Sequence, residues 1–147
     1  MAPTGTLVIC VGNVARGDDG VAHRVAELLS AAALPVQIRL VTATGLDIAM
    51  AQDVSRASHL IVVDAERRDA PRVVVSALAP GTAAHSGHAI DAPGLLAVAA
   101  SLYAAAPPAT LVSVAAPEMA HGEGLSAKAK AASEEAARVV AALLRQE

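Results

Sequence analysis

The chain has 147 residues, enough for a single domain with helices on both faces of a sheet, and we expect no internal boundary within residues 1–147. Its formal net charge of -3 and its 11 scattered Lys and Arg residues argue against a nucleic-acid partner, and base stacking is excluded because Tyr103 is the only aromatic residue. No apolar run approaches the roughly 20 residues that span a bilayer, residues 1–5 do not resemble a signal peptide and Cys10 is the only cysteine, so we expect a cytoplasmic protein without disulfides and without a membrane partner.

Strands and helices are predicted to alternate along the whole chain. Compact or alternating apolar runs indicate strands, and apolar residues at helical spacing indicate helices. The predicted strands are residues 7–11, 36–41, 59–63, 73–78 and 110–114, and the predicted helices are residues 21–29, 46–54, 92–106 and a last one that starts after Ser126. Such alternation implies right-handed crossovers between parallel strands. We therefore expect an α/β fold, a three-layer α/β/α sandwich around a mainly parallel sheet of about five strands.

Individual residues add detail to this outline. Pro71 and Pro80 flank the strand at 73–78, which favours a position at the edge of the sheet. Asp91 is the predicted N-cap of the third helix, and Ser126 that of the last. The third helix is expected to bury Leu95, Leu96, Val98 and Leu102.

Polar side chains occur where several of these strands end. Asp18 and Asp19 follow the first strand, Asp64 closes the third, and His88 lies in the loop after the fourth. Because the carboxyl ends of parallel strands meet at one edge of a sheet, these side chains should lie close together. Two carboxylates and an imidazole suit a borderline divalent metal such as zinc or nickel, with positions left open for water or substrate.

Simpler roles compete with this interpretation. Asp18 could cap the first helix, with Asp19 stabilised by the helix dipole. His85 and His88 share one loop, and either could be merely solvated. An Asp that ends a buried strand needs a hydrogen-bonding partner or a ligand, which favours a functional role for Asp64.

The loop after the last strand carries further polar residues. His121 and Glu123 are expected at the same edge of the sheet, where they could contact a substrate. His23, on the first helix, and His59, at a strand start, are expected to be structural.

Three other kinds of α/β site fit the residues less well. A receiver domain shares the acidic pair and the Asp after the third strand, but it has a lysine after the fifth strand, where residues 114–116 here read Val-Ala-Ala. Residues 12–17 lack the glycine order of a dinucleotide site. Serine hydrolase chemistry would need a G-x-S-x-G elbow, and the sequence has none.

Several short motifs lie one after another along nearly the whole chain. They are Gly12-Asn13, GDDGV at 17–21, Thr44-Gly45, HLIVVDA at 59–65, His88 followed by Leu95-Leu96, and GLS at 124–126. In this order and spacing they resemble the hydrogenase maturation endopeptidases, which trim the carboxyl terminus of nickel-iron hydrogenase large subunits.

The resemblance implies that Asp19, Asp64 and His88 are the catalytic residues and coordinate the metal. His88 is preferred to His85 because its distance to the Leu-Leu pair fits the family pattern, and Asp18 keeps the capping role. The chain departs from the family at Asp19, where Glu is frequent, so that this carboxylate reaches less far. It also has Ala22 where a glycine is common.

The function implied by the resemblance is a metal-dependent, nickel-recognising endopeptidase. Its substrate would be the nickel-loaded precursor of a nickel-iron hydrogenase large subunit, from which it removes a C-terminal extension. The nickel would be carried by the substrate, with another divalent metal as the alternative. One chemical route is polarisation of the carbonyl by the metal, with Asp19 or Asp64 acting as base. The alternative function is a module that docks or checks a metallated partner without cutting it.

Overall fold

The computed structural model describes residues 4–35, 37–81, 85–86, 89–120 and 122–146. Its strands are β1 (Thr4–Val11), β2 (Ile38–Ala43), β3 (Ala57–Glu66), β4 (Val73–Leu78), β5 (His85–Ser86), β6 (Ala89–Ile90) and β7 (Ala109–Ala115). Its α-helices are α1 (Val21–Ala31), α2 (Ala51–Arg56), α3 (Ala92–Tyr103) and α4 (Ala127–Arg145). Two short 3-10 helices, η1 (Gly17–Gly20) and η2 (Ile48–Met50), precede α1 and α2.

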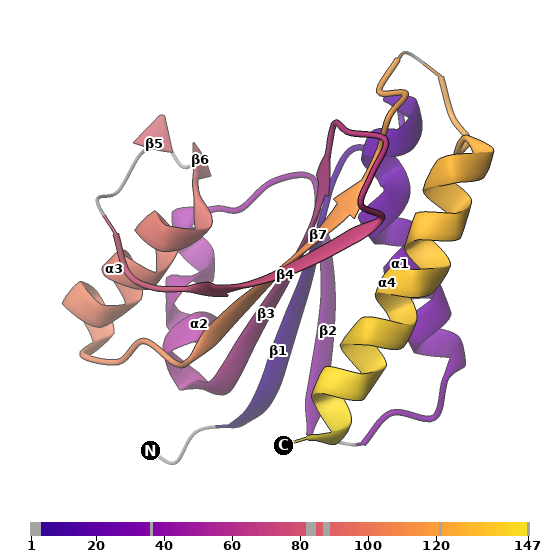
Figure 1. Cartoon of the computed structure of the whole chain (residues 1–147). Helices are drawn as coiled ribbons and strands as arrows, with labels where there is room; N and C mark the ends of the chain where they lie inside the picture. Colours follow the sequence, from indigo (N-terminus) through magenta and orange to yellow (C-terminus); the bar gives the residue numbers. More distant parts are fainter. Residues whose placement is uncertain (1–3, 36, 82–84, 87–88, 121, 147) are drawn as a thin grey trace.

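Five of the strands form one sheet in the order β2-β1-β3-β7-β4. All neighbours in it are parallel except β4, which runs antiparallel to β7. Helices α1 and α4 cover one face of the sheet, and α2 and α3 cover the other (Figure 1). The predicted three-layer α/β/α fold with a mainly parallel sheet is therefore confirmed.

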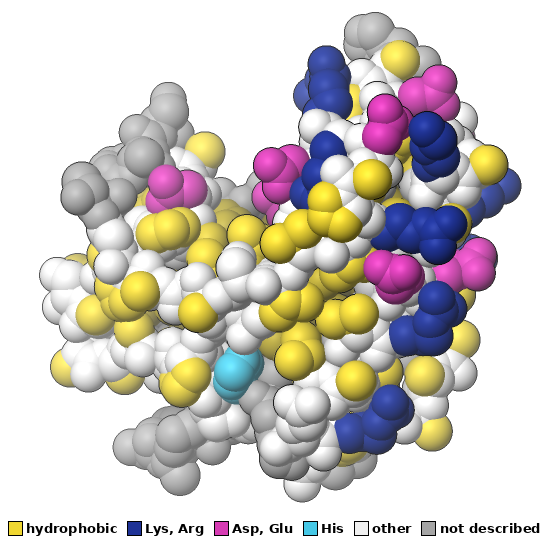
Figure 2. Space-filling view, in the orientation of Figure 1, with side chains coloured by type: hydrophobic (Ala, Val, Ile, Leu, Met, Phe, Trp, Pro, Cys, Tyr) yellow, Lys and Arg dark blue, Asp and Glu magenta, His cyan; other side chains and the backbone are white. Residues whose placement is uncertain are grey.

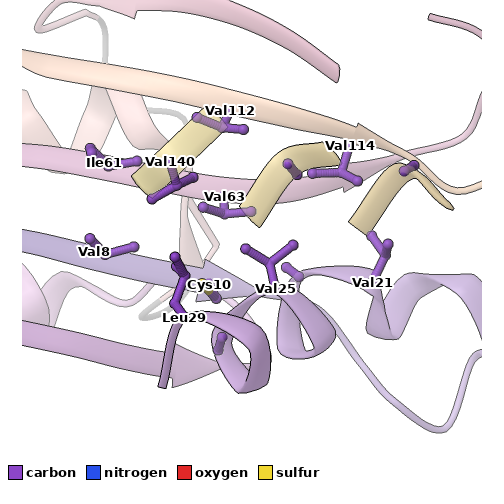
Figure 3. Close-up of a cluster of buried hydrophobic side chains, with 14 of the residues drawn as sticks. Val8, Cys10, Val21, Val25, Leu29, Ile61, Val63, Val112, Val114 and Val140 are labelled. Atoms are coloured by element: carbon purple, nitrogen blue, oxygen red, sulfur yellow. The ribbon is translucent and has the colours of Figure 1, made fainter. Parts of the chain in front are cut away.

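Alternation along the strands divides the core into two layers. In β3, Ile61 and Val63 face α1 and α4, whereas Leu60 and Val62 face α2 and α3. Figure 3 shows the first layer, where small β-branched side chains from the strands meet those of α1 and α4. Cys10 lies in this layer as a free thiol, and burial raises its pKa to about 12. Such a thiol packs as a small apolar side chain and is a poor nucleophile.

The edge position predicted for residues 73–78 is confirmed, since β4 pairs on one side with β7 and ends the strand order. Apolar side chains cross the middle of the view in Figure 2, where β4 lies in Figure 1, and Val74 and Val75 of this strand are 40% and 46% exposed. Basic side chains gather instead on the side of α4 (Figure 2).

Helix α3 corrects one prediction. Asp91 caps it as expected, accepting a hydrogen bond from the Gly94 amide at 2.8 Å. Leu102, however, is 66% exposed and lies outside the core, so its assignment to the buried stripe is wrong. The helix ends at Tyr103 because Ala104 turns left-handed, with φ of 59°. The apolar stripe therefore continues past the part of the helix that the core covers.

Helix α4 is 19 residues long and carries lysine, glutamate and arginine on its outer side. No helix in the described part of the chain is both long and apolar enough to cross a membrane.

Candidate functional site

The site lies where the direction of winding of the sheet reverses. The chain leaves β1 towards β2 on one side, and it leaves β3 towards β7 and β4 on the other (Figure 1). In such sheets the carboxyl ends of the two strands at the reversal diverge into a crevice, which is the usual ligand site of open α/β folds. Val11 at the end of β1 pairs in register with Asp64 on β3. Asp64 on β3 and Asp19, which follows β1, therefore both lie at this crevice.

Asp19 lies on η1, directly after the loop that follows β1. Its half-buried carboxylate accepts a hydrogen bond from the Asn13 amide through Oδ2 at 3.1 Å. The backbone of Gly12 passes against that of Asp19 so closely that a Cβ atom on Gly12 would overlap the Asp19 carbonyl oxygen. Glycine at position 12 is thus what lets Asp19 fold back over the end of β1.

Asp64 does not end its strand as predicted, because β3 continues to Glu66. Its side chain is exposed to solvent but is still partly desolvated by the surrounding protein. This partial burial is the largest cause that raises its pKa, from 3.8 to about 6, and the negative charges of Asp19 and Glu66 raise it further. A hydrogen bond with the Ala65 backbone acts in the opposite direction. The charge of Asp19 acts on Asp64 because the two carboxylates lie near each other at this end of the sheet.

Two carboxylates that repel each other across a crevice are suited to a hard or borderline cation, which would remove the repulsion. In the described ranges no three His, Cys, Asp or Glu side chains are grouped so that they could hold a metal ion. His88, the predicted third ligand, lies outside the described residues, as does His121. The assignment of Asp19, Asp64 and His88 to a metal therefore stays a prediction.

The backbone immediately after position 88 is fixed at the same end of the sheet. Ala89 forms an antiparallel bridge with Asp47, and the Ile90 amide donates to the Leu46 carbonyl at 3.3 Å. Leu46 and Asp47 belong to the loop that follows β2, the neighbour of β1. The segment that leads into α3 is thus anchored at the edge where Asp19 and Asp64 lie.

Asp18 has a different role from the predicted one. Helix α1 begins after Gly20 with no side-chain cap, so Asp18 does not cap it. Instead the Asp18 side chain is fully buried and reaches across to the loop before α4. It accepts hydrogen bonds from the Glu118 amide at 2.8 Å, the Ser126 amide at 2.7 Å and the Ser126 hydroxyl at 2.7 Å. Asp18 therefore joins η1 to the start of the last helix.

Solved structures of several hydrogenase maturation proteases superimpose on this chain along almost all of its length. The hydrogenase maturating endopeptidase HybD from E. coli is 22% identical, with a TM-score of 0.74 over 99% of this chain and 93% of that one. The hydrogenase 2 maturation peptidase from Thaumarchaeota archaeon SCGC_AB-539-E09 is 26% identical, with a TM-score of 0.71 over 97% and 99% of the two chains. The [NiFe] hydrogenase maturation protease HycI from Thermococcus kodakarensis KOD1 is 18% identical, with a TM-score of 0.74 over 97% and 93%.

The chain has the fold of the hydrogenase maturation endopeptidases. The resemblance that the motifs predicted is thereby confirmed. No protein-family model matches the sequence, and no curated protein matches it significantly.

Two polar networks around the site have no signal in the local sequence. Ser113 on β7, which pairs in register with Asp64, binds Arg68 and Glu66 through its hydroxyl at 2.6 and 2.7 Å. His23 on α1 contacts the Gly12 carbonyl at 2.7 Å through Nε2. Both networks join residues from separate elements of the fold. Spacing along the sequence therefore could not have revealed them.

Proposed function

We propose that this chain is an endopeptidase that removes a C-terminal extension from the nickel-loaded precursor of a nickel-iron hydrogenase large subunit. The observation that carries the proposal is the pair of facing carboxylates, Asp19 and Asp64, at the reversal point of a sheet shared with hydrogenase maturation proteases. A protease role is supported by these structural neighbours, which are hydrogenase maturation proteases. The nickel requirement and the choice of precursor rest on the motif resemblance.

Within this proposal the two carboxylates have different tasks. Asp64, with a pKa of about 6, is mostly ionised at neutral pH and still basic enough to accept a proton from water. We assign it as the base that takes the proton of the attacking water and returns it to the leaving amine. Asp19 is oriented by its hydrogen bond from the Asn13 amide. We assign it to orient the substrate's metal.

The nickel belongs to the substrate in this proposal. Asp19 and Asp64 would supply oxygen ligands, and His88 is the proposed nitrogen ligand. A cation between the carboxylates would favour their ionised forms and would lower the pKa of Asp64 from its raised value. Recognition of the nickel would thus bring the scissile segment to the base and keep that base ionised.

The direct test is to incubate the purified protein with a nickel-loaded and a nickel-free large-subunit precursor. Intact-protein mass spectrometry should show loss of a C-terminal peptide from the nickel-loaded precursor only. Asp64→Asn should lower the cleavage rate by at least about a hundredfold because the base is removed. Asp19→Asn and His88→Ala should weaken binding of the nickel-loaded precursor as well as its cleavage.

Asp53→Asn is the matched control, because it makes the same change in an exposed ion pair with Arg39 at 3.2 Å. Arg39 pairs in register with Leu7, which precedes Val11 by four residues in β1. The ion pair therefore lies away from the end of the sheet where Val11 pairs with Asp64. Cleavage of neither precursor, or full activity of both Asp19→Asn and His88→Ala, would overturn the proposal. Nickel-dependent association without loss of mass would instead indicate a module that checks its partner without cutting it.

A further inference from the structure

One peptide group of the site is held at both of its ends. The carbonyl oxygen of Gly12 lies 2.7 Å from Nε2 of His23, and the amide nitrogen of Asn13 lies 3.1 Å from Oδ2 of Asp19. These two atoms belong to the same peptide bond. His23 and Asp19 are therefore connected through a single planar unit.

The chemistry of the partners fixes the direction of these hydrogen bonds. A carbonyl oxygen only accepts, so Nε2 of His23 must carry the proton. A carboxylate only accepts, so the Asn13 amide is the donor to Asp19. A hydrogen bond to the carbonyl of a peptide strengthens the amide on its other side as a donor, since bonds in a chain polarise one another. The His23 contact therefore reinforces the Asn13 contact with Asp19.

The preceding peptide group, between Val11 and Gly12, is also fixed in space. The amide of Gly12 donates to the Ala43 carbonyl at 3.0 Å, which anchors the loop to the end of β2. Without His23, the described hydrogen bonds left at this peptide group and its neighbour would be that of the Asn13 amide to Asp19 and that of the Gly12 amide to Ala43. The plane of the Gly12–Asn13 peptide could then rotate, and the donor to Asp19 would turn away. Loss of the His23 contact would therefore loosen the hold of the Asn13 amide on Asp19.

We propose that His23 is a positioning residue for Asp19, acting through the peptide group between Gly12 and Asn13. This inference deepens the proposed function and rests on it for the part that concerns cleavage. His23 sits on the first turn of α1 and touches neither carboxylate of the site in the described contacts. Its effect on Asp19 is therefore transmitted by geometry and polarisation.

Open space beside His23 should accommodate other side chains at this position. The His23 side chain lines a cavity of about 400 Å³ together with Val14, Glu27 and Leu125. His23→Gln keeps a donor of similar reach, and His23→Leu keeps similar volume without a donor. His59→Leu is the matched control, because His59 pairs with Thr6 near the start of β1 and so lies at the opposite end of the sheet.

Nuclear magnetic resonance tests the inference without any substrate. In the unmodified protein, long-range nitrogen–proton spectra of the imidazole should show a proton on Nε2, and an Nδ1–H tautomer would overturn the inference. In His23→Leu, the Asn13 amide proton should shift upfield and exchange with solvent about tenfold faster. His23→Gln should restore both values, and His59→Leu should leave them unchanged. An Asn13 amide unaffected by His23→Leu would refute the proposed connection.

Cleavage provides the second readout. His23→Leu should lower kcat for the nickel-loaded precursor by roughly ten- to a hundredfold, with a smaller change in KM, and His23→Gln should recover most of it. Equal loss in both variants would show that the histidine acts only by packing and would overturn the positioning role. If the unmodified protein cleaves no precursor, the proposed function fails, and the amide spectra still decide the link between His23 and Asp19.

Discussion

Asp18 and Asp19 are adjacent acids with opposite environments. Asp18 is 1% exposed and accepts three hydrogen bonds, whereas Asp19 is half-buried beside Asp64. A carboxylate that satisfies buried amides cannot be removed without leaving those donors unpaired. The first acid of the pair therefore holds the structure together, and the second remains available for a ligand.

Asp18→Ala should accordingly lower the free energy of unfolding by about 3 kcal/mol. Asp18→Asn should also be destabilising, because the NH₂ group of asparagine would point at one of the N–H or O–H groups that now donate to the carboxylate. Urea denaturation at neutral pH measures both effects. The control is Asp53→Asn, which breaks an exposed ion pair with Arg39 and should change the free energy of unfolding by less than about 1 kcal/mol. A loss of less than about 1 kcal/mol in Asp18→Ala would contradict the assigned role.

Gly12 leaves no room for a side chain beside Asp19. In Gly12→Ala the new methyl group would overlap the backbone of Asp19, so η1 must move away from the end of β1. We expect cleavage to fall by about a hundredfold or more, since displacement of a catalytic group by about 1 Å has that effect. Gly45→Ala is the matched control, because nothing lies within 4 Å of a Cβ atom there. Normal cleavage by Gly12→Ala would show that the close approach is unimportant.

At the scale of single elements, local patterns predicted most of the fold. Val21 to Leu29 has helical spacing and forms most of α1, and the caps Asp91 and Ser126 lie where expected. These features depend only on neighbours within a few residues. Leu102 was misplaced because helical spacing does not reveal how far the core extends beneath a helix. Asp18 was misassigned because its partners lie 100 and 108 residues away in the sequence.

The start of α4 combines a local cap with a long-range contact. Ser126 accepts a hydrogen bond from the Ala129 amide at 3.1 Å and donates one to Asp18. Ser126→Ala should lower the free energy of unfolding by about 1–2 kcal/mol. Ser126→Asp should be worse than alanine although Asp is normally a good N-cap, because its charge would face Asp18. Thermal unfolding compares the two, and a Ser126→Asp variant as stable as the unmodified protein would contradict the contact between Ser126 and Asp18.

At the scale of the whole molecule, the site exists only once the sheet is assembled. Asp19 and Asp64 are separated by more than 40 residues and meet because β1 and β3 are neighbours in the strand order. Alternating strands and helices made this meeting predictable, since parallel strands bring their carboxyl ends to one edge. The link from His23 through Gly12 was not predictable, because it depends on how the loop after β1 is folded.

The raised pKa of Asp64 makes the stability of the whole protein depend on pH. In the unfolded chain this carboxyl has its ordinary pKa of 3.8, and in the folded protein its pKa is about 6. Between these pH values the folded state binds more protons, so the contribution of Asp64 to stability decreases as pH rises through this window. Above about pH 6 the folded protein carries the full cost of holding an ionised carboxylate beside Asp19.

Asp64→Asn removes that cost. The variant should therefore have a higher Tm than the unmodified protein at pH 7, and the difference should shrink towards zero near pH 4. Thermal melts at pH 4 and pH 7 measure the effect. The control Asp53→Asn should show no such pH-dependent difference in Tm. The kcat/KM for cleavage, which reports the free enzyme, should show the opposite trend, because the unmodified protein loses its ionised base as pH falls below about 6. The more stable variant should have little activity at any pH. An Asp64→Asn protein that melts lower than the unmodified one at pH 7 would mean that Asp64 is stabilised as an anion, and its assignment as the base would then be wrong.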